Sequence, residues 1–386
     1  MRITFISNYL NHHQRYLADE LSNMDFKFIA TREIGIERQL LGYSSEKNCD
    51  YLILSYESKE LEDKAKRRID SSDIVISGSA PEKFLKDYKK TDGILFRYTE
   101  RPLKNGIELR KFLPRLVKWH YQNRNKKKVY LLCASAFTTT DYKKFLLFKN
   151  HAYKWGYFPE TKKYDINKLL DKKNKKMILW CGRFVDWKHP EDAIKLAIKL
   201  KENGFDFNLK MIGNGNLELE LKKLVKEYKL EEYVEFLGAI PSKRVREYME
   251  QAGIYIFTSD RKEGWGAVLN EAMNSGCAVV ASHLIGAAPY LVKHKENGLI
   301  YKSKNIEMLY EYVKFLLENQ NFQNMYGEKA YKTIIDEWNA EVAAERLWNL
   351  SRHILDGEEV PVLYQTGPCS SAEEITEDWI YKEVCV

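Results

Sequence analysis

The sequence lacks several features that define other classes of protein. No apolar run approaches the roughly 18 residues that a membrane-spanning helix needs, so we expect no transmembrane segment. No Asp-x-Asp triplet is present, and Asp186 and Asp260 are isolated, so we expect neither a metal site nor a cofactor. There is no Cys-x-x-Cys pair, which favours reduced thiols over a zinc site or a disulfide framework. The cysteines are Cys49, Cys133, Cys181, Cys277, Cys369 and Cys385.

The composition is that of a folded protein with a moderate positive charge. Of the 386 residues, 44% are hydrophobic and 30% are charged, which excludes a disordered chain, and the length favours two domains. Residues 1–6 enter a strand pattern without the apolar core of a secretory signal, so we expect a cytoplasmic protein. The net charge of +7 admits anionic partners, but no nucleic-acid-binding motif accompanies it, and we expect no nucleic-acid partner.

Both halves of the sequence repeat a short buried strand, a turn and an amphipathic helix, which predicts an α/β protein with two doubly wound parallel sheets. Strand-like runs of the first half lie at 3–7, 26–31, 51–55, 74–77, 94–98 and 129–133. Those of the second half lie at 177–181, 207–212, 234–237, 254–258, 278–281 and 299–301. Helices are predicted at 12–21, after an Asn11–Gln14 capping box, at 82–89 and at 190–203, with prolines at the start of the last two.

A polar, lysine-rich segment sets the predicted domain boundaries. It ends in Asp171-Lys-Lys-Asn-Lys-Lys176, a composition typical of an interdomain linker. The pattern is helical from about Gln320 through Leu355. We predict an N-terminal domain at 1–158, a linker at 159–176, a C-terminal domain at 177–336, and a C-terminal helix and tail at 337–386 that pack back on the first domain.

One stretch of the second half places glycines, carboxylates and a helix N-terminus at the carboxyl end of a strand, where ligands bind in parallel sheets. The strand at 254–258 leads through a loop to a predicted helix at 267–274. Gly264 and Gly266 would let the backbone approach a ligand, and the first helical amides would be unpaired donors for a diphosphate or sugar hydroxyls. Glu263 and Glu271, eight positions apart, would accept hydrogen bonds from different parts of one elongated ligand.

The run Glu263-Gly-Trp-Gly-Ala-Val-Leu-Asn-Glu271-Ala-Met-Asn-Ser-Gly-Cys-Ala-Val-Val-Ala-Ser282 resembles the E-x7-E signature of family-four glycosyltransferases, retaining enzymes of the GT-B fold. Three other segments resemble the family at strand ends: the loop from Gly182-Arg183 to Lys188, the turn Gly213–Gly215 and the segment Gly238–Ile240. The resemblance covers roughly 177–317 well and the first domain loosely. It implies two Rossmann-like domains facing a cleft, with a nucleotide-sugar donor held mainly by the second.

The resemblance also implies roles for particular residues. Glu263 would contact the donor sugar, and Glu271 would hold the ribose diol. Arg183 and Lys188 would stabilise the charge of the leaving diphosphate, as a metal does elsewhere. The remaining donor-binding residues implied are Gly182, Gly213, Gly215, Gly238, Ala239, Ile240, Gly264, Trp265, Gly266, Ala267, Val268 and Leu269.

The first domain departs from the family pattern, so the prediction of how the acceptor is bound is supported by fewer residues. The usual glycine pair after the first strand is replaced by Asn8-Tyr-Leu-Asn-His-His-Gln14, and the family's loop histidine by Tyr98-Thr-Glu-Arg101. In the second domain, Gly286-Ala-Ala-Pro-Tyr290 ends in a tyrosine where the family often has a glutamate. We predict a catalytic role for His13, and acceptor-side roles for Asn11, His12, Ser79, Glu100 and Arg101. Alternatively, His12 and His13 are exposed residues in the first turn of a helix, and Glu100 and Arg101 form ordinary surface contacts.

These features predict transfer of a sugar from a nucleotide-diphosphate sugar, preferably a UDP-sugar, to a hydroxyl of a glycan or lipid-linked acceptor with retention of configuration. By analogy with the family, the leaving phosphate takes the acceptor proton. The expected setting is cell-surface polysaccharide biosynthesis. Two alternatives share the architecture, a noncatalytic protein that binds sugar nucleotides and a sugar-nucleotide epimerase. A basic nucleic-acid binder would explain the charge but not the ordered glycine and glutamate motifs.

A basic stretch at 102–128 admits two interpretations. It contains nine Lys or Arg residues and one acidic residue, Glu108, interleaved with Leu109, Phe112, Leu113, Leu116, Val117 and Trp119. In the first interpretation, the stretch forms a peripheral contact with the anionic inner face of the plasma membrane. In the second, it is a solvated helix that packs its apolar face on the sheet and breaks near Pro114.

Overall fold

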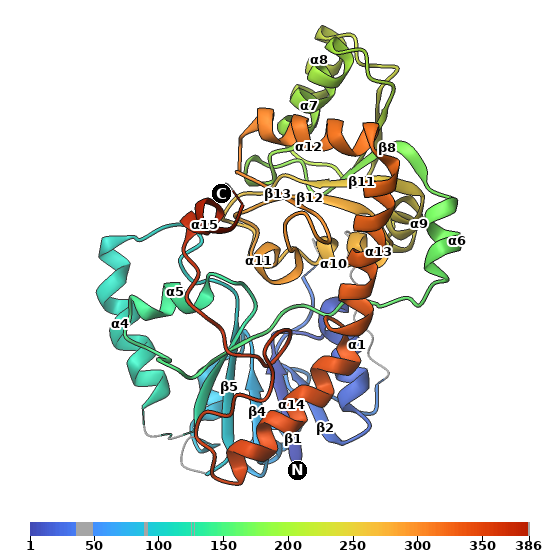
Figure 1. Ribbon diagram of the computed structural model, residues 1–386. Helices are drawn as coiled ribbons and strands as arrows, with labels where there is room; N and C mark the ends of the chain where they lie inside the picture. Colours follow the sequence, from blue (N-terminus) through green and yellow to red (C-terminus); the bar gives the residue numbers. More distant parts are fainter. Residues whose placement is uncertain (36–48, 89–91, 125, 127, 385–386) are drawn as a thin grey trace. The chain divides into compact units, whose positions relative to one another are not determined.

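The computed structural model describes residues 1–35, 49–88, 92–124, 126 and 128–384, and the chain forms two compact units (Figure 1). The N-terminal unit consists of Met1–Pro159 and Asn339–Ile375. The C-terminal unit consists of Glu160–Trp338 and Thr376–Val386. Each unit is therefore built from two separate segments of the chain. No helix among the described residues combines the length and apolar character needed to span a bilayer.

The N-terminal unit has, in its described part, a seven-stranded parallel sheet in the order β3-β2-β1-β4-β5-β6-β7. Because β1 pairs with both β2 and β4, the order reverses there, and ligands of such sheets bind at the carboxyl ends of the strands around this point. The strands are β1 (Arg2–Ser7), β2 (Asp25–Ala30), β3 (Leu52–Leu54), β4 (Ile74–Ser77), β5 (Ile94–Thr99), β6 (Val129–Cys133) and β7 (Ala152–Lys154). The helices are α1 (His12–Leu21), α3 (Lys59–Asp70), η1 (Glu82–Leu85), α4 (Leu109–Asn123), α5 (Thr138–Lys143) and α14 (Ala340–Leu355).

The C-terminal unit has a six-stranded parallel sheet in the order β10-β9-β8-β11-β12-β13 within the described residues. The strands are β8 (Asn174–Cys181), β9 (Asn208–Ile212), β10 (Val234–Gly238), β11 (Ala252–Phe257), β12 (Ala278–Ser282) and β13 (Leu299–Tyr301). The longer helices are α7 (Pro190–Glu202), α8 (Glu218–Glu227), α9 (Ser242–Gln251), α10 (Ala267–Asn274), α12 (Ile306–Glu318) and α13 (Gln320–Asp336). The short ones are α6 (Ile166–Asp171), η3 (Asp186–Lys188), α11 (Ala288–Leu291), η4 (Glu377–Trp379) and α15 (Ile380–Glu383).

Each sheet is covered by apolar helix faces, as the strand and helix periodicities predict. In the C-terminal unit, Ile178 and Ile254 of the sheet share one buried cluster with Leu196 of α7 and Leu309 of α12. Burial of each such side chain contributes about 1.5–3 kcal/mol relative to exposure. In the N-terminal unit, Val75 of β4 is buried in a cluster of its own. The predicted parallel α/β architecture is therefore confirmed for both units.

The element boundaries differ from the predicted ones in a few places. The predicted linker contains α6, and β8 begins at Asn174 rather than Met177. The predicted helix at 82–89 is a single 3-10 turn, η1, and its last residue lies outside the described residues. The helical pattern from 320 to 355 is divided into α13 and α14 by a break at 337–339. The prediction that α4 could break near Pro114 was wrong, because the helix runs through this proline.

The C-terminal tail, which has no predicted chemical role, protects a sheet edge. Tyr153 of the edge strand β7 forms an antiparallel bridge with Ser371, and the Lys154 amide donates to the Ser370 carbonyl at 2.7 Å. Such pairing satisfies backbone groups that an open edge leaves free. Further on, the Trp379 indole donates to the His283 carbonyl at 3.0 Å within the C-terminal unit. The described cysteines are free thiols, whereas Cys385 lies outside the described residues.

Candidate active site

The glycine turns after β8, β9 and β10 are in backbone contact at the carboxyl edge of the C-terminal sheet. The Gly182 amide donates to the Ile212 carbonyl at 3.0 Å, and the Gly213 amide donates to the Gly238 carbonyl at 2.8 Å. A Cβ on Gly213 would lie 1.9 Å from the Gly182 carbonyl oxygen, and one on Gly215 would lie 2.3 Å from the Phe184 carbonyl oxygen. Gly213 and Gly215 are therefore required for packing between neighbouring loops, and their contact with a donor stays a prediction.

Lys188 and Glu263 form an ion pair beside these turns. The two side chains are 12% and 11% exposed, and the Ser259 hydroxyl donates a further hydrogen bond to Glu263 at 3.0 Å. The position of a Cβ on Gly182 is 3.6 Å from Lys188 Cδ, so the glycine turn and the cation are adjacent. The Lys188 carbonyl accepts from Thr258 at 2.6 Å, which fixes the loop after β8 to the end of β11. The structure thus brings together the residue expected to contact the donor sugar, Glu263, and one of the two cations expected at the leaving diphosphate, Lys188.

Glu271 lies in the same region and has an unusual environment. Burial raises the pKa of its carboxyl group, and the nearby Arg246 guanidinium lowers it only in part. No hydrogen bond or ion pair to this carboxylate is formed within the described part of the chain. Both Glu271 and Lys188 act electrostatically on the Cys181 thiol, whose pKa burial raises to about 12. A desolvated carboxylate of this kind gains much from a ligand that donates two hydrogen bonds, as a diol does.

The loop before α10 has a conformation that depends on its glycine and tryptophan. Gly266 caps the helix with φ +94°, and a Cβ there would lie 2.7 Å from the Phe257 ring, so only glycine fits. The Trp265 side chain is fully buried and donates to Asn270 Oδ1 at 2.9 Å. Only its backbone is therefore left for the predicted donor contact.

The predicted set of three unpaired amides at the start of α10 was wrong for Leu269, whose amide donates to the Gly266 carbonyl at 2.9 Å. The tight turn at the left-handed cap brings that carbonyl within reach. Donor contacts of Gly264, Ala267 and Val268 stay predictions, as do those of Ala239, which is exposed, and Ile240, which is half-buried.

Arg183 is exposed and lies over Trp187, with 5.5 Å from the guanidinium carbon to the ring centroid. Trp187 also lies under Lys188, at 4.8 Å from Nζ. An aromatic face against two cations stabilises them without neutralising their charge. Among the described residues, no group of three or more His, Cys, Asp or Glu side chains is placed to hold a metal ion.

Sequence reasoning did not identify His189, which joins two loops of this site. Its Nδ1 lies 2.8 Å from Glu191 Oε1, and its Nε2 lies 3.4 Å from Asp260 Oδ2. The Asp260 amide also donates to the Trp187 carbonyl at 2.9 Å. Burial disfavours the charged imidazole, but the hydrogen bonds to Asp260 and Glu191 outweigh this effect and raise the pKa of His189 to about 9. The only local signal in the sequence is its position between Lys188 and Pro190.

The stability of the protein is expected to fall as the pH rises toward 9 because of His189. A pKa raised from 6.5 to about 9 contributes stability that is complete below pH 6.5 and is lost as the pH passes the folded-state value. The expected loss is on the order of 2 kcal/mol. In His189→Gly, glycine suits the φ of 49° at this position, and the dependence of the melting temperature on pH between 6.5 and 9 should flatten. An unchanged pH slope in this variant would show that other groups set it.

The N-terminal unit brings His13 and Glu100 together through a residue that the sequence did not point to. The His13 ring stacks on Tyr157, with centroids 5.4 Å apart and planes 8° from parallel. The Tyr157 hydroxyl donates to Glu100 Oε1 at 2.6 Å, and Lys104 Nζ donates to Glu100 Oε2 at 3.2 Å. The residues of this cluster follow β1, β5 and β7, and Tyr157 is 57 positions from its partner, so no local pattern could find it.

The other predicted acceptor-side residues are in different surroundings. Asn11 caps α1 by accepting from the Gln14 amide at 3.0 Å, which confirms the predicted capping interaction. His12 lies beside His13, with ring centroids 3.6 Å apart, and Ser79 is exposed. Arg101 is buried in an ion pair with Asp141 at 3.3 Å, an arrangement that favours a structural role. Acceptor binding by these residues stays a prediction.

Comparisons with known proteins agree with the chemistry of the C-terminal unit. Residues 161–333 match the family model described as Glycosyl transferases group 1. An uncharacterized glycosyltransferase of Haemophilus influenzae is 32% identical over 180 residues, which are 45% of this chain and 50% of that protein. A Campylobacter jejuni N-acetylgalactosamine-N,N'-diacetylbacillosaminyl-diphospho-undecaprenol 4-alpha-N-acetylgalactosaminyltransferase is 32% identical over 155 residues, 40% of this chain and 41% of that protein. The chain thus matches half or less of the length of these relatives.

The fold likeness extends over both units. Anabaena HepE, crystallised with UDP and glucose, matches with a TM-score of 0.64 at 15% identity, covering 92% of this chain and 100% of that chain. At this identity the match establishes the fold, which is GT-B. The segment 161–333 of the C-terminal unit is thus similar to the group 1 glycosyltransferases, and the fold of the chain is the one seen in HepE.

Proposed function

We propose that this protein transfers a sugar, with retention of configuration, from a nucleotide-diphosphate sugar to a hydroxyl of a glycan or lipid-linked acceptor in cell-surface polysaccharide biosynthesis. The observation that carries the proposal is the half-buried carboxylate of Glu271, which has no partner among the described residues and lies in the same region as the Lys188–Glu263 pair. A ribose diol supplies the two donors that Glu271 lacks, and Lys188 supplies the charge that a departing diphosphate needs. A UDP-sugar is the favoured donor, since HepE was crystallised with UDP and glucose.

In the proposed reaction, the acceptor oxygen forms a bond to the anomeric carbon as the bond to the β-phosphate oxygen breaks. The acceptor proton passes to the leaving phosphate, so no carboxylate nucleophile is needed. Arg183 and Lys188 stabilise the growing negative charge, and Glu263 orients Lys188 and the donor sugar. The cluster of His13, Tyr157 and Glu100 is proposed to bind the acceptor hydroxyl. We further propose a cytoplasmic location.

Incubation of the protein with UDP-, GDP- and ADP-sugars tests this function directly. Without an acceptor, we expect slow release of one nucleoside diphosphate, because water substitutes poorly for the acceptor hydroxyl. NMR of the released sugar should show the anomeric configuration of the donor. Conversion of the donor sugar into another sugar, still attached to the nucleotide, would identify an epimerase. Nucleotide binding without any release, in the presence of lipid-linked glycan extracts, would identify a noncatalytic binding protein.

A further inference from the structure

Helix α4 has two apolar faces, and only one of them is packed. On the inner face, the Phe112 and Phe145 rings stack with centroids 4.6 Å apart, and the Trp119 ring lies 4.6 Å from the Phe145 ring. His120 Nε2 lies 2.8 Å from the Phe145 carbonyl oxygen, which further fixes the helix to the unit. The inner face of α4 therefore provides the packing that was expected if the basic stretch is a helix with its apolar face against the unit.

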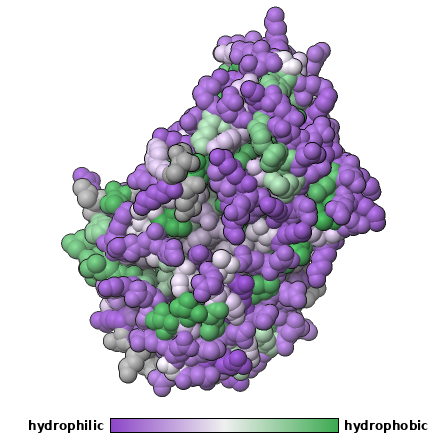
Figure 2. Space-filling model, in the orientation of Figure 1, coloured by the Kyte–Doolittle hydropathy of each residue, from purple (hydrophilic) through white to green (hydrophobic). Residues whose placement is uncertain are grey.

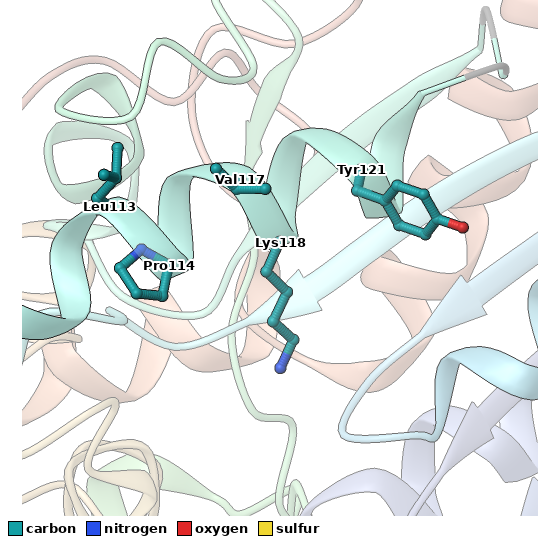
Figure 3. Close-up of a pocket in the computed structure, with 5 residues that line it drawn as sticks. All are labelled: Leu113, Pro114, Val117, Lys118 and Tyr121. Atoms are coloured by element: carbon teal, nitrogen blue, oxygen red, sulfur yellow. The ribbon is translucent and has the colours of Figure 1, made fainter.

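The outer face of α4 forms an exposed apolar stripe. Leu113, Val117 and Tyr121 follow one another at intervals of four, which places them in a row, and they are 64%, 62% and 59% exposed. With Pro114 and Lys118 they line a shallow groove along the helix (Figure 3). Figure 2 shows hydrophobic surface at the left edge of the view, where Figure 1 draws α4. A contiguous row of exposed apolar side chains is typical of an interaction surface.

Cations border this stripe along α4, and the nearest acidic residue in the sequence, Glu108 at the start of the helix, is paired with Lys111. Arg110, Lys118 and Arg124 are exposed on or at the end of the helix, and α4 contains no acidic residue. The Arg124 guanidinium lies 3.8 Å from the centroid of the Tyr121 ring, so a cation and an amphipathic ring are presented together. Apolar side chains bordered by Lys, Arg and Tyr fit the boundary between acyl chains and anionic headgroups.

We propose that the outer face of α4 docks on an anionic lipid bilayer, with Leu113, Val117 and Tyr121 inserted below the headgroups and Arg110, Lys118 and Arg124 bound to lipid phosphates. A bilayer fits better than a protein partner because the stripe is a single exposed row of apolar side chains with cations beside it. This docking needs no nucleotide sugar, so it is independent of the proposed transfer reaction.

Flotation of the full-length protein with phosphatidylcholine vesicles containing about one-third phosphatidylglycerol tests the proposal. We expect the wild type to float with these vesicles, to float poorly with pure phosphatidylcholine, and to be released by high salt. The double variant Leu113→Gln with Val117→Gln should bind at least about tenfold more weakly, because two inserted aliphatic side chains are lost. Arg110→Glu with Lys118→Glu should lose the preference for anionic vesicles.

The matched control is Leu219→Gln with Val362→Gln, which replaces two aliphatic side chains that are 83% and 58% exposed elsewhere. This control should float like the wild type, and unchanged melting temperatures should show that all variants are folded. Equal flotation of the stripe variant and the wild type would overturn the proposal. Self-association that the stripe variant abolishes, without vesicle binding, would instead assign the surface to a second copy of the chain. Binding of RNA without vesicle binding would likewise overturn it.

Discussion

Replacement of Glu271 by alanine is expected to remove most of the thermal stabilisation that a nucleoside diphosphate gives the wild-type protein. A ligand at a hundredfold its dissociation constant stabilises a protein by about 2.7 kcal/mol. Two hydrogen bonds from a diol to a carboxylate contribute about 1.5–3 kcal/mol each, so the affinity should fall at least about thirtyfold. The measurement is a thermal shift with UDP, GDP and ADP for both proteins.

The same substitution should not destabilise the free protein. Burial raises the pKa of Glu271, which means that folding places its charge in an unfavourable environment, and removal of the carboxylate relieves this cost. Glu227→Ala, an exposed carboxylate of α8, serves as the control and should keep the nucleotide shift. A Glu271→Ala protein that responds to nucleotide as the wild type does would place the nucleotide at another site.

Loss of the Lys188–Glu263 pair is expected to cost about 100- to 1,000-fold in kcat, because a positioned cation acts mainly on charge that develops in the transition state. Single substitutions would lower the stability of the protein as well as kcat, because they leave one charge of a mostly buried pair without a partner. The double variant Lys188→Met with Glu263→Gln avoids the unpaired charge. It should stay folded and bind nucleotide through Glu271, yet release nucleoside diphosphate from the donor far more slowly.

The more exposed pair Lys210–Glu235, with side chains 22% and 50% exposed on neighbouring strands of the same sheet, offers the matched control. Lys210→Met with Glu235→Gln should change neither kcat nor the melting temperature appreciably, because exposed ion pairs contribute little. If the Lys188 and Glu263 double variant released nucleotide at the wild-type rate, the proposed stabilisation of the leaving group would be wrong.

The sequence by itself determined the strands, the two parallel sheets and the candidate donor residues. Strands at 74–77, 129–133 and 299–301 and the helix at 267–274 match the structure because buried runs and local caps act over a few residues. The E-x7-E run could be found for the same reason, since its loop and helix form one continuous segment. Trp265 shows the limit of such reasoning, because its neighbouring glycines suggested a ligand contact and its side chain is buried.

Only the tertiary structure decided which distant groups meet. The contacts of His189 with Asp260 and of Tyr157 with Glu100 join residues 71 and 57 positions apart. The requirement for glycine at 213 arises from the carbonyl of Gly182, in the loop after the neighbouring strand β8, which local periodicity does not reveal. The two faces of α4 are a similar case, because Phe112 and Leu113 are adjacent and apolar, and packing alone made one an anchor and left the other exposed. Sequence pattern fixes local conformation and burial tendency, whereas partners depend on strand order and on the loops that it brings together.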